Sequence, residues 1–528
     1  MPDYNICFAG AAGDGIKEAG VLAAKLFSKL GYNAFVYQEY QSLIRGGHNA
    51  SVVRFSERKI RSHRYYYDVL ICLEDYVYDR HKDRLKGILI HDSKFNLDGK
   101  AVPMTEFVKE EQKPLFFRNA VALGVLAYVF GIDFEVLEDV FIESYGNKAS
   151  DDIVLAEEGY NFAEENFERL EELEKIGEEK KVHSGNEMVA LGMIKAGLER
   201  FYAYPMTPTS PILHFLVRRE DVIAYQPESE IAAIMMAIGS AFAGKRAATA
   251  TSGGGFALMT ESISLAGMAE VPVLIVYGQR SAPSTGMATY TAQEDLYFAL
   301  NPAHGEFPLI VASPIDCEDA YKLGAELLNL AWKFQTPAIL LSDKHLLESY
   351  ETVSYPKVKR ERINIVRKSE GVFKRYEITR NGISPYAVPP AIVKANSNEH
   401  DEYGFTTDDA EIARKMYEKR MKKVKEIEKE VRNSYVEEGK GSETIVTWGS
   451  NYGAVREVAE ELGFKVVAVR FLKPLDVPKI KENSYCVECN YQGLLAGMIE
   501  KEQGIKLRRI LRWDGRPFTP EELKEVLK

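Results

Sequence analysis

The chain has few cysteines, no excess of positive charge and no long hydrophobic run, and each absence excludes a class of protein. Five cysteines in 528 residues cannot form a disulfide framework and indicate a reducing interior. With 78 acidic and 67 basic residues the net charge is −11, which disfavours binding DNA or RNA through phosphate contacts. The nearly uncharged stretch 231–244 is too short to span a bilayer, and the first residues lead into a strand without a signal peptide. We therefore expect a cytoplasmic protein that binds neither nucleic acid nor membrane.

What the chain does have is enough length and apolar content for several domains. At about 150 residues per domain, 528 residues predict three to four. With 46% hydrophobic residues the chain can bury a large core without disulfides or a structural metal. Predicted strands and helices alternate over most of it, which is typical of an α/β fold. We expect an α/β domain with a charged helical tail, a second α/β domain, a linker and a third α/β domain, at 1–182, 183–350, 351–440 and 441–528.

Two highly charged stretches are predicted to be helical. Residues 157–181 have few apolar positions and read as a helix that leads into an exposed linker. Residues 411–431 carry apolar side chains at helical spacing within a highly charged sequence. We expect this second helix to lie along the surface of its own protein, with a coiled-coil partner as the alternative.

A glycine-rich turn follows the first predicted strand. It reads Gly10-Ala-Ala-Gly13-Asp-Gly15 and precedes an apolar helix, so its backbone N–H groups could bind a phosphate or a nucleotide. Its G-x-x-G-x-G spacing differs from the dinucleotide motif G-x-G-x-x-G. Further along, Arg45 in Arg-Gly-Gly-His could meet a phosphate or could simply lie on the surface of a tight turn.

The densest set of polar groups lies in the second domain, directly after a predicted strand. Thr207, Thr209 and Ser210 crowd the start of a helix that Thr209 or Ser210 would cap. Parallel α/β proteins bind ligands at the carboxyl ends of their strands, and hydroxyl groups at a helix start suit a carboxylate or a phosphate. Helix capping alone would explain the same residues.

Further groups follow later strands of the same domain. Glu230 opens a helix of small residues, whose close packing would bury the carboxylate and require a partner for it. Ser252 and Gly253 begin a second glycine turn. Arg280 also follows a strand and could meet the Thr207 turn, where a guanidinium and hydroxyl groups would receive a small carboxylate. Alternatively, Arg280 pairs with a nearby acid.

These segments together resemble a known family, the thiamine-diphosphate-dependent 2-oxoacid:ferredoxin oxidoreductases. The second domain resembles the family's α subunit in YPMTPTSP, PESEIAAI, ATSGGGFALMTE, EVPVLIV and QRSAPSTGMAT followed by QED. GAAGDGI and YQSLIRGGHNASVVRFS resemble the family's γ domain, here fused ahead of α. SNEHDEYG and VTWGSNYGAVREV resemble its linker and carboxy-terminal domain. The resemblance implies a γ-type domain, a pyrimidine-binding-type domain and a transketolase C-terminal-like domain.

The resemblance also implies an activity: coenzyme A-dependent oxidative decarboxylation of a 2-oxoacid to acyl-CoA and CO₂, with electrons passed to ferredoxin. Thr207 and Arg280 would hold the substrate's carboxylate and keto group, with Thr209 and Ser210 beside them. Glu230 would contact N1′ of the cofactor's aminopyrimidine. The other residues that the resemblance implies are Ser252 and Gly253 for the cofactor, and Gly13, Gly15 and Arg45 for coenzyme A or a subunit interface.

The sequence departs from the family pattern at a few positions. The usual turn reads YPITPSS, so Met206 and Thr209 are substitutions, although both keep the polarity pattern. Gly254 stands where the usual SGPG has proline, which loosens the turn without removing a donor.

The diphosphate and metal motif of this family is missing. That motif is GDG followed at a set distance by asparagine, and the chain's only GDG, Gly13-Asp14-Gly15, has Asn33 and Asn49 off that spacing. Cys486 and Cys489 form the one C-x-x-C, and the other three cysteines are scattered, so a four-cysteine cluster lacks ligands. We expect no metal on this chain, and Mg²⁺ and a [4Fe–4S] cluster on a separate β subunit that shares the thiamine diphosphate.

We therefore expect a heterodimer or a dimer of heterodimers that acts on a 2-oxoacid, coenzyme A and ferredoxin. Two other functions are left open: a nucleotide-binding oxidoreductase subunit that uses the first glycine turn, and a non-catalytic scaffold subunit. The sequence does not distinguish pyruvate, 2-oxoglutarate and branched-chain 2-oxoacids.

Overall fold

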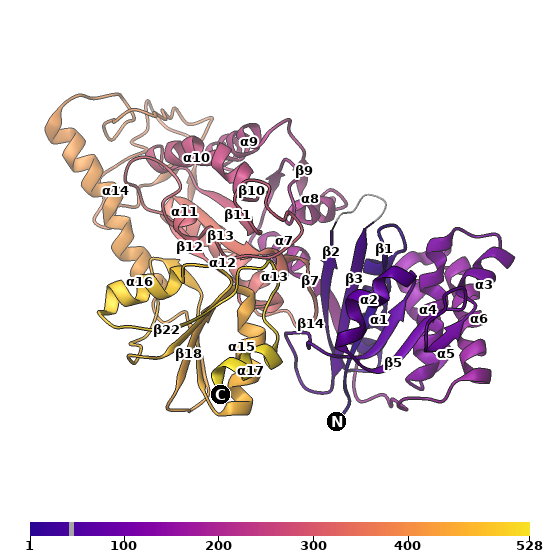
Figure 1. Cartoon of the computed structure of the whole chain (residues 1–528). Helices are drawn as coiled ribbons and strands as arrows, with labels where there is room; N and C mark the ends of the chain where they lie inside the picture. The colour runs from indigo at the N-terminus through magenta and orange to yellow at the C-terminus, as the bar shows by residue number, and fades with distance from the viewer. Residues whose placement is uncertain (42–46) are drawn as a thin grey trace. The chain divides into compact units, whose positions relative to one another are not determined.

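The computed structural model describes residues 1–41 and 47–528, and it has the expected α/β fold (Figure 1). The chain forms two compact units. The first comprises Met1–Ser184, Glu348–Ser354 and Thr519–Lys528, and the second comprises Gly185–Leu347 and Tyr355–Phe518. Arg45 lies outside the described residues.

The first unit is built on an eight-stranded mixed sheet in the order β6-β5-β4-β1-β3-β2-β14-β7. Its strands are β1 (Asp3–Ala11), β2 (Asn33–Tyr40), β3 (His48–Ser56), β4 (Tyr67–Cys72), β5 (Leu85–Asp92), β6 (Lys100–Val102), β7 (Lys181–Ser184) and β14 (Tyr350–Val353). Its helices are α1 (Ile16–Lys29), α2 (Tyr78–His81), α3 (Met104–Glu110), α4 (Arg118–Val129), α5 (Phe134–Tyr145), α6 (Ser150–Asn166) and α17 (Pro520–Leu527).

Aromatic rings join the helices of this unit to its sheet. Phe27 of α1 stacks on Phe55 of β3 with ring centroids 3.8 Å apart, and Phe130 meets Phe55 edge to face at 5.2 Å. All three side chains are buried. Such pairs stabilise a core beyond the area that they bury, so α1 and α4 are firmly fixed over β3.

The helix predicted at the start of 157–181 ends at Asn166, and residues 167–180 form the segment that follows it. Their backbone N–H groups instead bond to the ends of earlier helices: Leu170 to the carbonyl of Val129, and Ile176 to that of Leu30. The last carbonyls of a helix have no partner within the helix. Hydrogen bonds to these carbonyls therefore stabilise the segment more than a longer helix would, because that helix would have few apolar side chains to bury.

The second unit contains a seven-stranded sheet in the order β20-β12-β13-β11-β10-β8-β9. All neighbouring pairs are parallel except β12 and β20. The strands are β8 (Arg200–Tyr202), β9 (Ile223–Tyr225), β10 (Ala247–Thr251), β11 (Val273–Gln279), β12 (Ile310–Ala312), β13 (Pro337–Asp343) and β20 (Phe471–Lys473). The expected parallel sheet is confirmed, and every residue of β11 and β13 is buried, as in a sheet covered on both faces.

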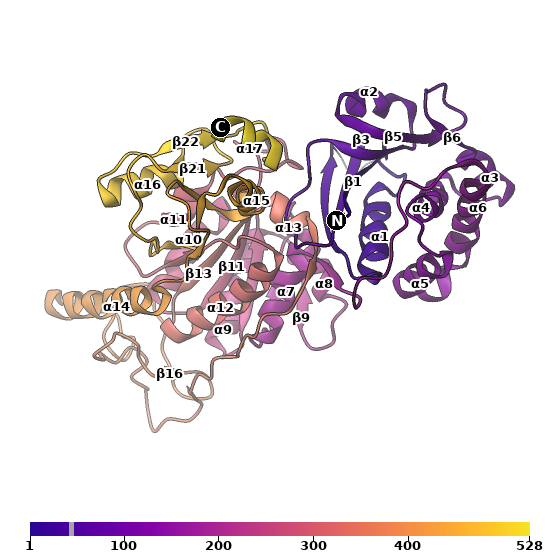
Figure 2. The same ribbon diagram turned by 90° about the horizontal axis from the view of Figure 1, so that it is seen from below.

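Helices pack in pairs around this sheet. Helix α7 packs against α12, α9 packs against α10, and α9, α10 and α12 contact its strands (Figure 2). The helices of this region are α7 (Gly185–Lys195), α8 (Ser210–Leu216), α9 (Glu230–Phe242), α10 (Gly253–Met268), α11 (Leu296–Leu300), α12 (Cys317–Phe334) and α13 (Lys344–Glu348).

A five-stranded sheet belongs to the same unit, in the order β17-β19-β18-β21-β22. The Gln293 side chain, which follows β11 of the seven-stranded sheet, bonds to the five-stranded sheet and the residues next to it. Its Nε2 donates to the Trp448 carbonyl at 3.0 Å, and its Oε1 accepts from the Asn451 side chain and from the Cys489 backbone. The remaining elements are β15 (Ile365–Val366), β16 (Tyr386–Ala387), β17 (Val436–Glu438), β18 (Thr444–Trp448), β19 (Lys465–Val469), β21 (Tyr485–Glu488), β22 (Arg508–Leu511), α15 (Tyr452–Leu462) and α16 (Leu494–Gln503).

The charged helix α14 (Ala410–Val431) packs on its own unit through ion pairs as well as apolar contacts. Lys419 and Lys423 each lie 2.5 Å from the buried carboxylate of Glu270. Burial lowers the pKa of Lys419 to about 7, while the two lysines hold the pKa of Glu270 below its ordinary value against the effect of burial. Removing one partner of such a buried pair leaves a charge uncompensated, so the contact fixes how the helix docks.

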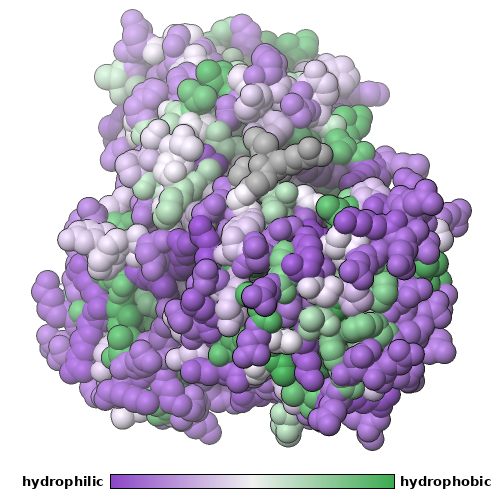
Figure 3. All heavy atoms as spheres, turned by 45° about the vertical axis from the view of Figure 1, so that its right-hand side comes forward, coloured by the Kyte–Doolittle hydropathy of each residue, from purple (hydrophilic) through white to green (hydrophobic). Residues whose placement is uncertain are grey.

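Within residues 1–41 and 47–528, none of the helices combines the length and apolarity that crossing a bilayer requires. On the face shown in Figure 3 the surface is mostly hydrophilic, with hydrophobic residues in small patches.

Candidate active site

The candidate residues of the second unit gather at one edge of its parallel sheet. Thr207 follows β8, Glu230 follows β9, Ser252 follows β10 and Arg280 follows β11. These four strands are consecutive in the sheet order. Because the carboxyl ends of parallel strands lie at the same edge, four separate sequence motifs come together there.

Arg280 contacts the Thr207 turn directly. Its Nη1 donates to the Thr207 carbonyl at 2.9 Å, which fixes one side of the guanidinium. Burial lowers the pKa of Arg280, with the Asp295 charge opposing the effect, but an arginine remains protonated in proteins. In the part of the chain that the structure describes, no carboxylate lies within 4 Å of this guanidinium. The alternative of a direct Arg–acid pair is therefore not observed among the described residues, and Asp295 acts on Arg280 only from beyond 4 Å.

Thr209 and Ser210 serve mainly the turn itself. The Thr209 hydroxyl donates to the Met206 carbonyl at 3.0 Å, and the Ser210 N–H donates to the same carbonyl at 3.1 Å. Thr209 occupies the N-cap position of α8, as expected, but its side chain makes no capping bond to the helix. With seven residues, α8 is also a short helix. The predicted capping geometry is therefore not found, and the Thr209 hydroxyl already has a backbone partner.

Glu230 is the buried carboxylate that the small-residue helix predicted. It is the first residue of α9 and is 5% exposed, while the preceding Ser229 caps the helix by accepting from Ala232 N at 3.2 Å. Its Oε1 lies only 2.5 Å from the point that a Cβ on Gly255 would occupy, so the absence of a side chain there makes room for it. Among the described residues no donor reaches this carboxylate. Burying a carboxylate without a donor is costly, so Glu230 is suited to a hydrogen-bond donor of a ligand.

Ser252 and Gly253 form the start of α10 beside Glu230. Ser252 is fully buried, and within the described ranges its hydroxyl has no hydrogen-bond partner. Gly253 faces two polar groups: Oδ2 of Asp295 lies 3.4 Å, and the Tyr277 hydroxyl 3.5 Å, from the point that a Cβ on Gly253 would occupy. A buried hydroxyl without a protein partner is suited to a hydrogen bond with a polar ligand.

Asp295 is a site residue that sequence reasoning did not assign. Burial raises its pKa to about 6, while the Tyr277 hydroxyl and Arg280 act in the opposite direction. The sequence feature that could have pointed to Asp295 is its place in Gln293-Glu294-Asp295, the QED segment that follows the Arg280 motif. Nothing in that segment indicates which of its acids turns toward the sheet edge.

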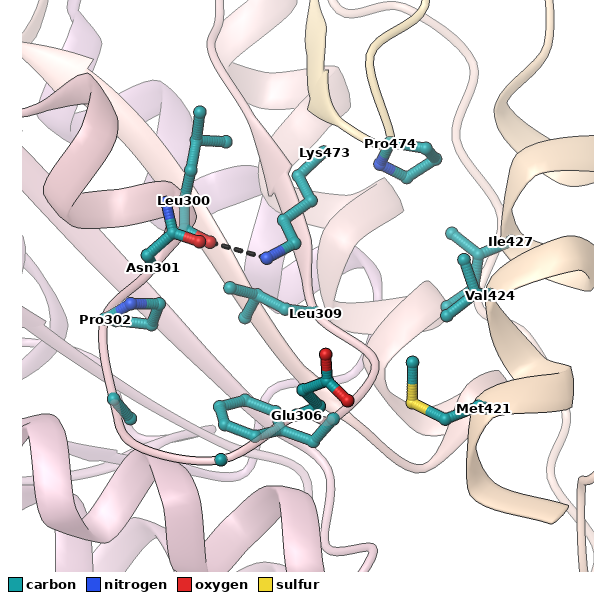
Figure 4. A pocket seen from close by; sticks show the side chains of 13 residues that line it. Leu300, Asn301, Pro302, Glu306, Leu309, Met421, Val424, Ile427, Lys473 and Pro474 are labelled. Atoms are coloured by element: carbon teal, nitrogen blue, oxygen red, sulfur yellow. Dashed lines mark hydrogen bonds between the residues drawn. The ribbon is translucent and has the colours of Figure 1, made fainter. Parts of the chain in front are cut away.

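A separate cavity of about 310 Å³ lies away from these residues, between α14 and the loop that follows α11 (Figure 4). Its walls are largely apolar, and Lys473 donates to the Leu300 carbonyl at 2.6 Å inside it. Glu306 is the carboxylate that lines it. None of the predicted site residues reaches this cavity, so we do not place the reaction there.

In the first unit, Gly13 and Gly15 adopt positive φ angles of 104° and 70°, which explains why the turn needs glycine. The Asp14 carboxylate between them accepts from Ala11 N at 2.9 Å and from the buried Arg118 at 3.0 Å. The Asp14 carboxylate therefore bonds within the turn and to Arg118.

A cavity of about 320 Å³ lies beside the turn, and its charged residues are Glu18, Asp152 and Lys148.

The five cysteines are all buried, as free thiols. Burial raises the pKa of Cys486 and of Cys489, so both remain protonated, and the Cys489 thiol lies 3.0 Å from Asn451 Oδ1. Over the described ranges, no three His, Cys, Asp or Glu side chains are grouped as they would be around a metal ion.

Two family models and several known proteins are similar to this chain. Residues 191–419, which carry it, match the family model "Pyruvate flavodoxin/ferredoxin oxidoreductase, thiamine diP-bdg", and residues 5–162 match "Pyruvate ferredoxin/flavodoxin oxidoreductase". The 2-oxoacid:ferredoxin oxidoreductase subunit alpha of a Sulfolobus species is 33% identical over 98% of this chain and 95% of its own length. The 2-oxoglutarate synthase subunit KorA of Archaeoglobus fulgidus is 33% identical over 55% of this chain and 79% of its own.

A solved structure is similar over the whole chain. The 2-oxoglutarate:ferredoxin oxidoreductase of Magnetococcus marinus, with 2-oxoglutarate, coenzyme A and succinyl-CoA bound, has a TM-score of 0.90 and 31% identity. The similarity covers 100% of this chain and 99% of that one. The shared fold, the thiamine-diphosphate-binding domain and the full-length relatives lead to one conclusion. The chain belongs to the 2-oxoacid:ferredoxin oxidoreductase family, as an α subunit.

Proposed function

We propose that this chain supplies the substrate-binding residues and the aminopyrimidine contact for oxidative decarboxylation of a 2-oxoacid to acyl-CoA and CO₂, with electrons passed to ferredoxin. The observation that carries the proposal is Glu230, a buried carboxylate without a donor, on the same sheet edge as the Arg280–Thr207 contact. The reaction needs a positive group that binds the substrate's carboxylate and a carboxylate that contacts the cofactor, and Arg280 and Glu230 supply these two charges.

Arg280 and Thr207 hold the 2-oxoacid. The guanidinium binds the substrate's carboxylate through N–H groups left free by its bond to the Thr207 carbonyl. The Thr207 hydroxyl contacts the keto group, and Thr209 and Ser210 shape the turn beside it. Fixing the carboxylate and the keto group together orients the 2-keto carbon for attack.

Glu230, Ser252 and Gly253 fit the aminopyrimidine end of thiamine diphosphate. The cofactor, when bound, supplies a carbon nucleophile and accepts the electrons of decarboxylation. Glu230 keeps a proton at N1′ of the ring, which favours the tautomer whose 4′-nitrogen accepts a proton. Ser252 satisfies its buried hydroxyl on the same ring, and Gly253 allows close approach.

Glycine at 255 is needed to leave room for Glu230. We expect Gly255→Ala to lower kcat about 10-fold or more, because its methyl group would displace the Glu230 carboxylate. The matched control is Gly254→Ala, since nothing lies within 4 Å of a Cβ at Gly254. Steady-state kinetics and thermal unfolding of both variants check this. Equal losses of activity in the two variants would contradict it.

A β subunit completes the enzyme by bringing Mg²⁺, the diphosphate site and a [4Fe–4S] cluster from which ferredoxin takes electrons. The bonds that Asp14 makes within the turn and the protonated Cys486 and Cys489 support this division. Apolar side chains of α9 and α10 that are 38–52% exposed next to the site offer the docking surface: Ile231, Met235, Met236 and Leu258. The assembly is a heterodimer or a dimer of heterodimers.

Coenzyme A accepts the acyl group, with Gly13, Gly15 and Arg45 as the contacts proposed for it or for a subunit interface. The cavity at Gly13 and Gly15 has two acids and one base, so its charge does not by itself favour phosphates. The positive groups that bind the phosphates of coenzyme A therefore have to come from Arg45 or from another part of the assembly.

The deciding experiment is co-purification with the β subunit, followed by assays with pyruvate, 2-oxoglutarate and a branched-chain 2-oxoacid. We expect the isolated chain to be inactive and to bind thiamine diphosphate poorly, and the complex to reduce ferredoxin with one of the three. Full activity of the isolated chain would contradict the two-subunit proposal. Unchanged turnover after substitution of Thr207, Glu230 and Arg280 would indicate a scaffold, and tight NAD(H) binding would indicate a nucleotide-binding oxidoreductase.

A further inference from the structure

Asp295 is a carboxyl group at the site to which the proposed function gives no role. It lies directly before α11, and its backbone N–H donates to Gln279 Oε1 at 3.1 Å. Gln279 is the fully buried last residue of β11, and Arg280 follows it in the chain. The Gln279 side chain therefore holds the Asp295 backbone at the strand end that Arg280 follows.

The Asp295 carboxyl is turned toward the start of α10. Its Oδ2 and the Tyr277 hydroxyl lie 3.4 and 3.5 Å from the same point, that of a Cβ on Gly253. The Tyr277 ring is buried and stacks on Phe256 with centroids 4.3 Å apart, so its hydroxyl has a defined place. The carboxyl thus faces the ligand-binding edge of the sheet.

Asp295 acts on Arg280 by its charge and not by contact. Each group affects the ionisation of the other: the pKa of Asp295, raised by burial to about 6, is held down in part by Arg280, and Asp295 opposes the burial effect on Arg280. No ion pair within 4 Å joins them among the described residues. The guanidinium N–H groups therefore stay available, while the positive potential around them depends on whether Asp295 is ionised.

We propose that Asp295 is a positioning residue that sets the charge a 2-oxoacid carboxylate meets at Arg280. Neutral Asp295 leaves the guanidinium uncompensated and favours binding, whereas ionised Asp295 cancels part of that charge and weakens binding. The inference rests on the proposed function, because it requires that Arg280 binds the substrate's carboxylate.

The neighbouring charged groups leave this role to Asp295. The Tyr277 hydroxyl of β11 lies beside the same Gly253 position as the Asp295 carboxyl and lowers the pKa of Asp295. The other groups on the elements packed around Asp295 are engaged as follows: Glu294 accepts from Ala282 N at 3.0 Å; Asp343 of β13 accepts from Leu346 N and Ser450 N; and Glu500 of α16 pairs with Arg509 at 2.7 Å. Helix α10 starts with Ser252 and Gly253, which carry no charge. Glu294, the preceding residue, thus has a carboxyl that bonds to a different backbone segment.

The test is the pH dependence of the KM for the 2-oxoacid in the assembled enzyme, from about pH 5 to about pH 8. The 2-oxoacid stays anionic over this range. In the wild type, KM should rise as the pH increases through about 6, the value to which burial raises the pKa of Asp295. Asp295→Asn should keep a low KM throughout, about 3- to 10-fold below the wild type at about pH 7.5, with little change in kcat.

Two further variants make the test specific. Glu294→Gln removes a neighbouring carboxyl whose charge raises the pKa of Asp295, so the rise in KM should persist but move to lower pH. Tyr277→Phe removes the hydroxyl that holds the pKa of Asp295 down, so the rise should move to higher pH. If Asp295→Asn fails to fold, Tyr277→Phe still tests the proposal. Phe keeps the ring of Tyr, so the packing of this side chain is preserved and folding should not be affected.

The results separate failure of the inference from failure of the proposed function. A KM for Asp295→Asn that rises with pH as in the wild type would overturn the inference, as would equal changes in the KM for the 2-oxoacid and for coenzyme A. If Arg280→Ala leaves the KM for the 2-oxoacid unchanged, the role of Arg280 in the proposed function fails.

Discussion

Replacing Glu230 by Gln is expected to lower kcat of the assembled enzyme by about 100-fold or more, because a neutral amide cannot stabilise a proton at N1′ of the aminopyrimidine. The same variant should stop exchange of the cofactor's C2 proton for deuterium, which NMR measures without turnover. Folding should survive, since Gln has the shape of Glu and no hydrogen bond within the described protein depends on this carboxylate.

The exposed carboxylate of Glu228 provides the control for this variant, two residues earlier in the same turn. Glu228→Gln should retain wild-type kcat and exchange, because Glu228 is solvated while Glu230 is buried. Gel filtration with the β subunit would establish that both variants assemble. Wild-type exchange at C2 in Glu230→Gln would rule out the role assigned to Glu230.

Replacing Arg280 by Ala is expected to raise the KM for the 2-oxoacid by about 10- to 100-fold, since hydrogen bonds to a charged group contribute about 1.5–3 kcal/mol. The KM for coenzyme A should change far less, because Arg280 contacts the Thr207 turn, where we propose that the 2-oxoacid binds. Arg280→Lys should give an intermediate value, since a lysine supplies the charge but not two parallel donors. Steady-state kinetics with each substrate varied in turn measures this.

Equal changes in both KM values would remove Arg280 from the substrate site and leave it a structural role in fixing the Thr207 turn. The two variants also differ in what they alter: Glu230→Gln should act on kcat and Arg280→Ala on KM. This difference separates an effect on chemistry from an effect on binding.

Much of the site could be predicted because it follows from local patterns. Strand, turn and helix alternate in the second unit, and such alternation leads to a parallel sheet with all turns after strands at one edge. Thr207, Glu230, Ser252 and Arg280 each occupy such a turn, so their convergence follows from topology alone. The burial of Glu230 could also be anticipated, since a helix of small residues packs closely.

Other features could not be predicted, because they depend on contacts between distant parts of the chain. The strand β14, which pairs with both β2 and β7, and the helix α17 belong to the first unit, although most of the intervening chain folds in the second. Residues 167–180 have the composition of a charged helix, yet they follow the carbonyl ends of α1 and α4. Such choices depend on which backbone groups remain unsatisfied elsewhere.

The sequence by itself determined the family, the parallel α/β fold of the second unit, and which residues follow its strands. Only the tertiary structure decided that Thr209 bonds to its own turn and that Asp295, but not Glu294, faces the edge beside Gly253. Local patterns place a residue at the end of a strand. The direction of its side chain depends on partners such as Gln279 and Ala282, which only packing brings within reach.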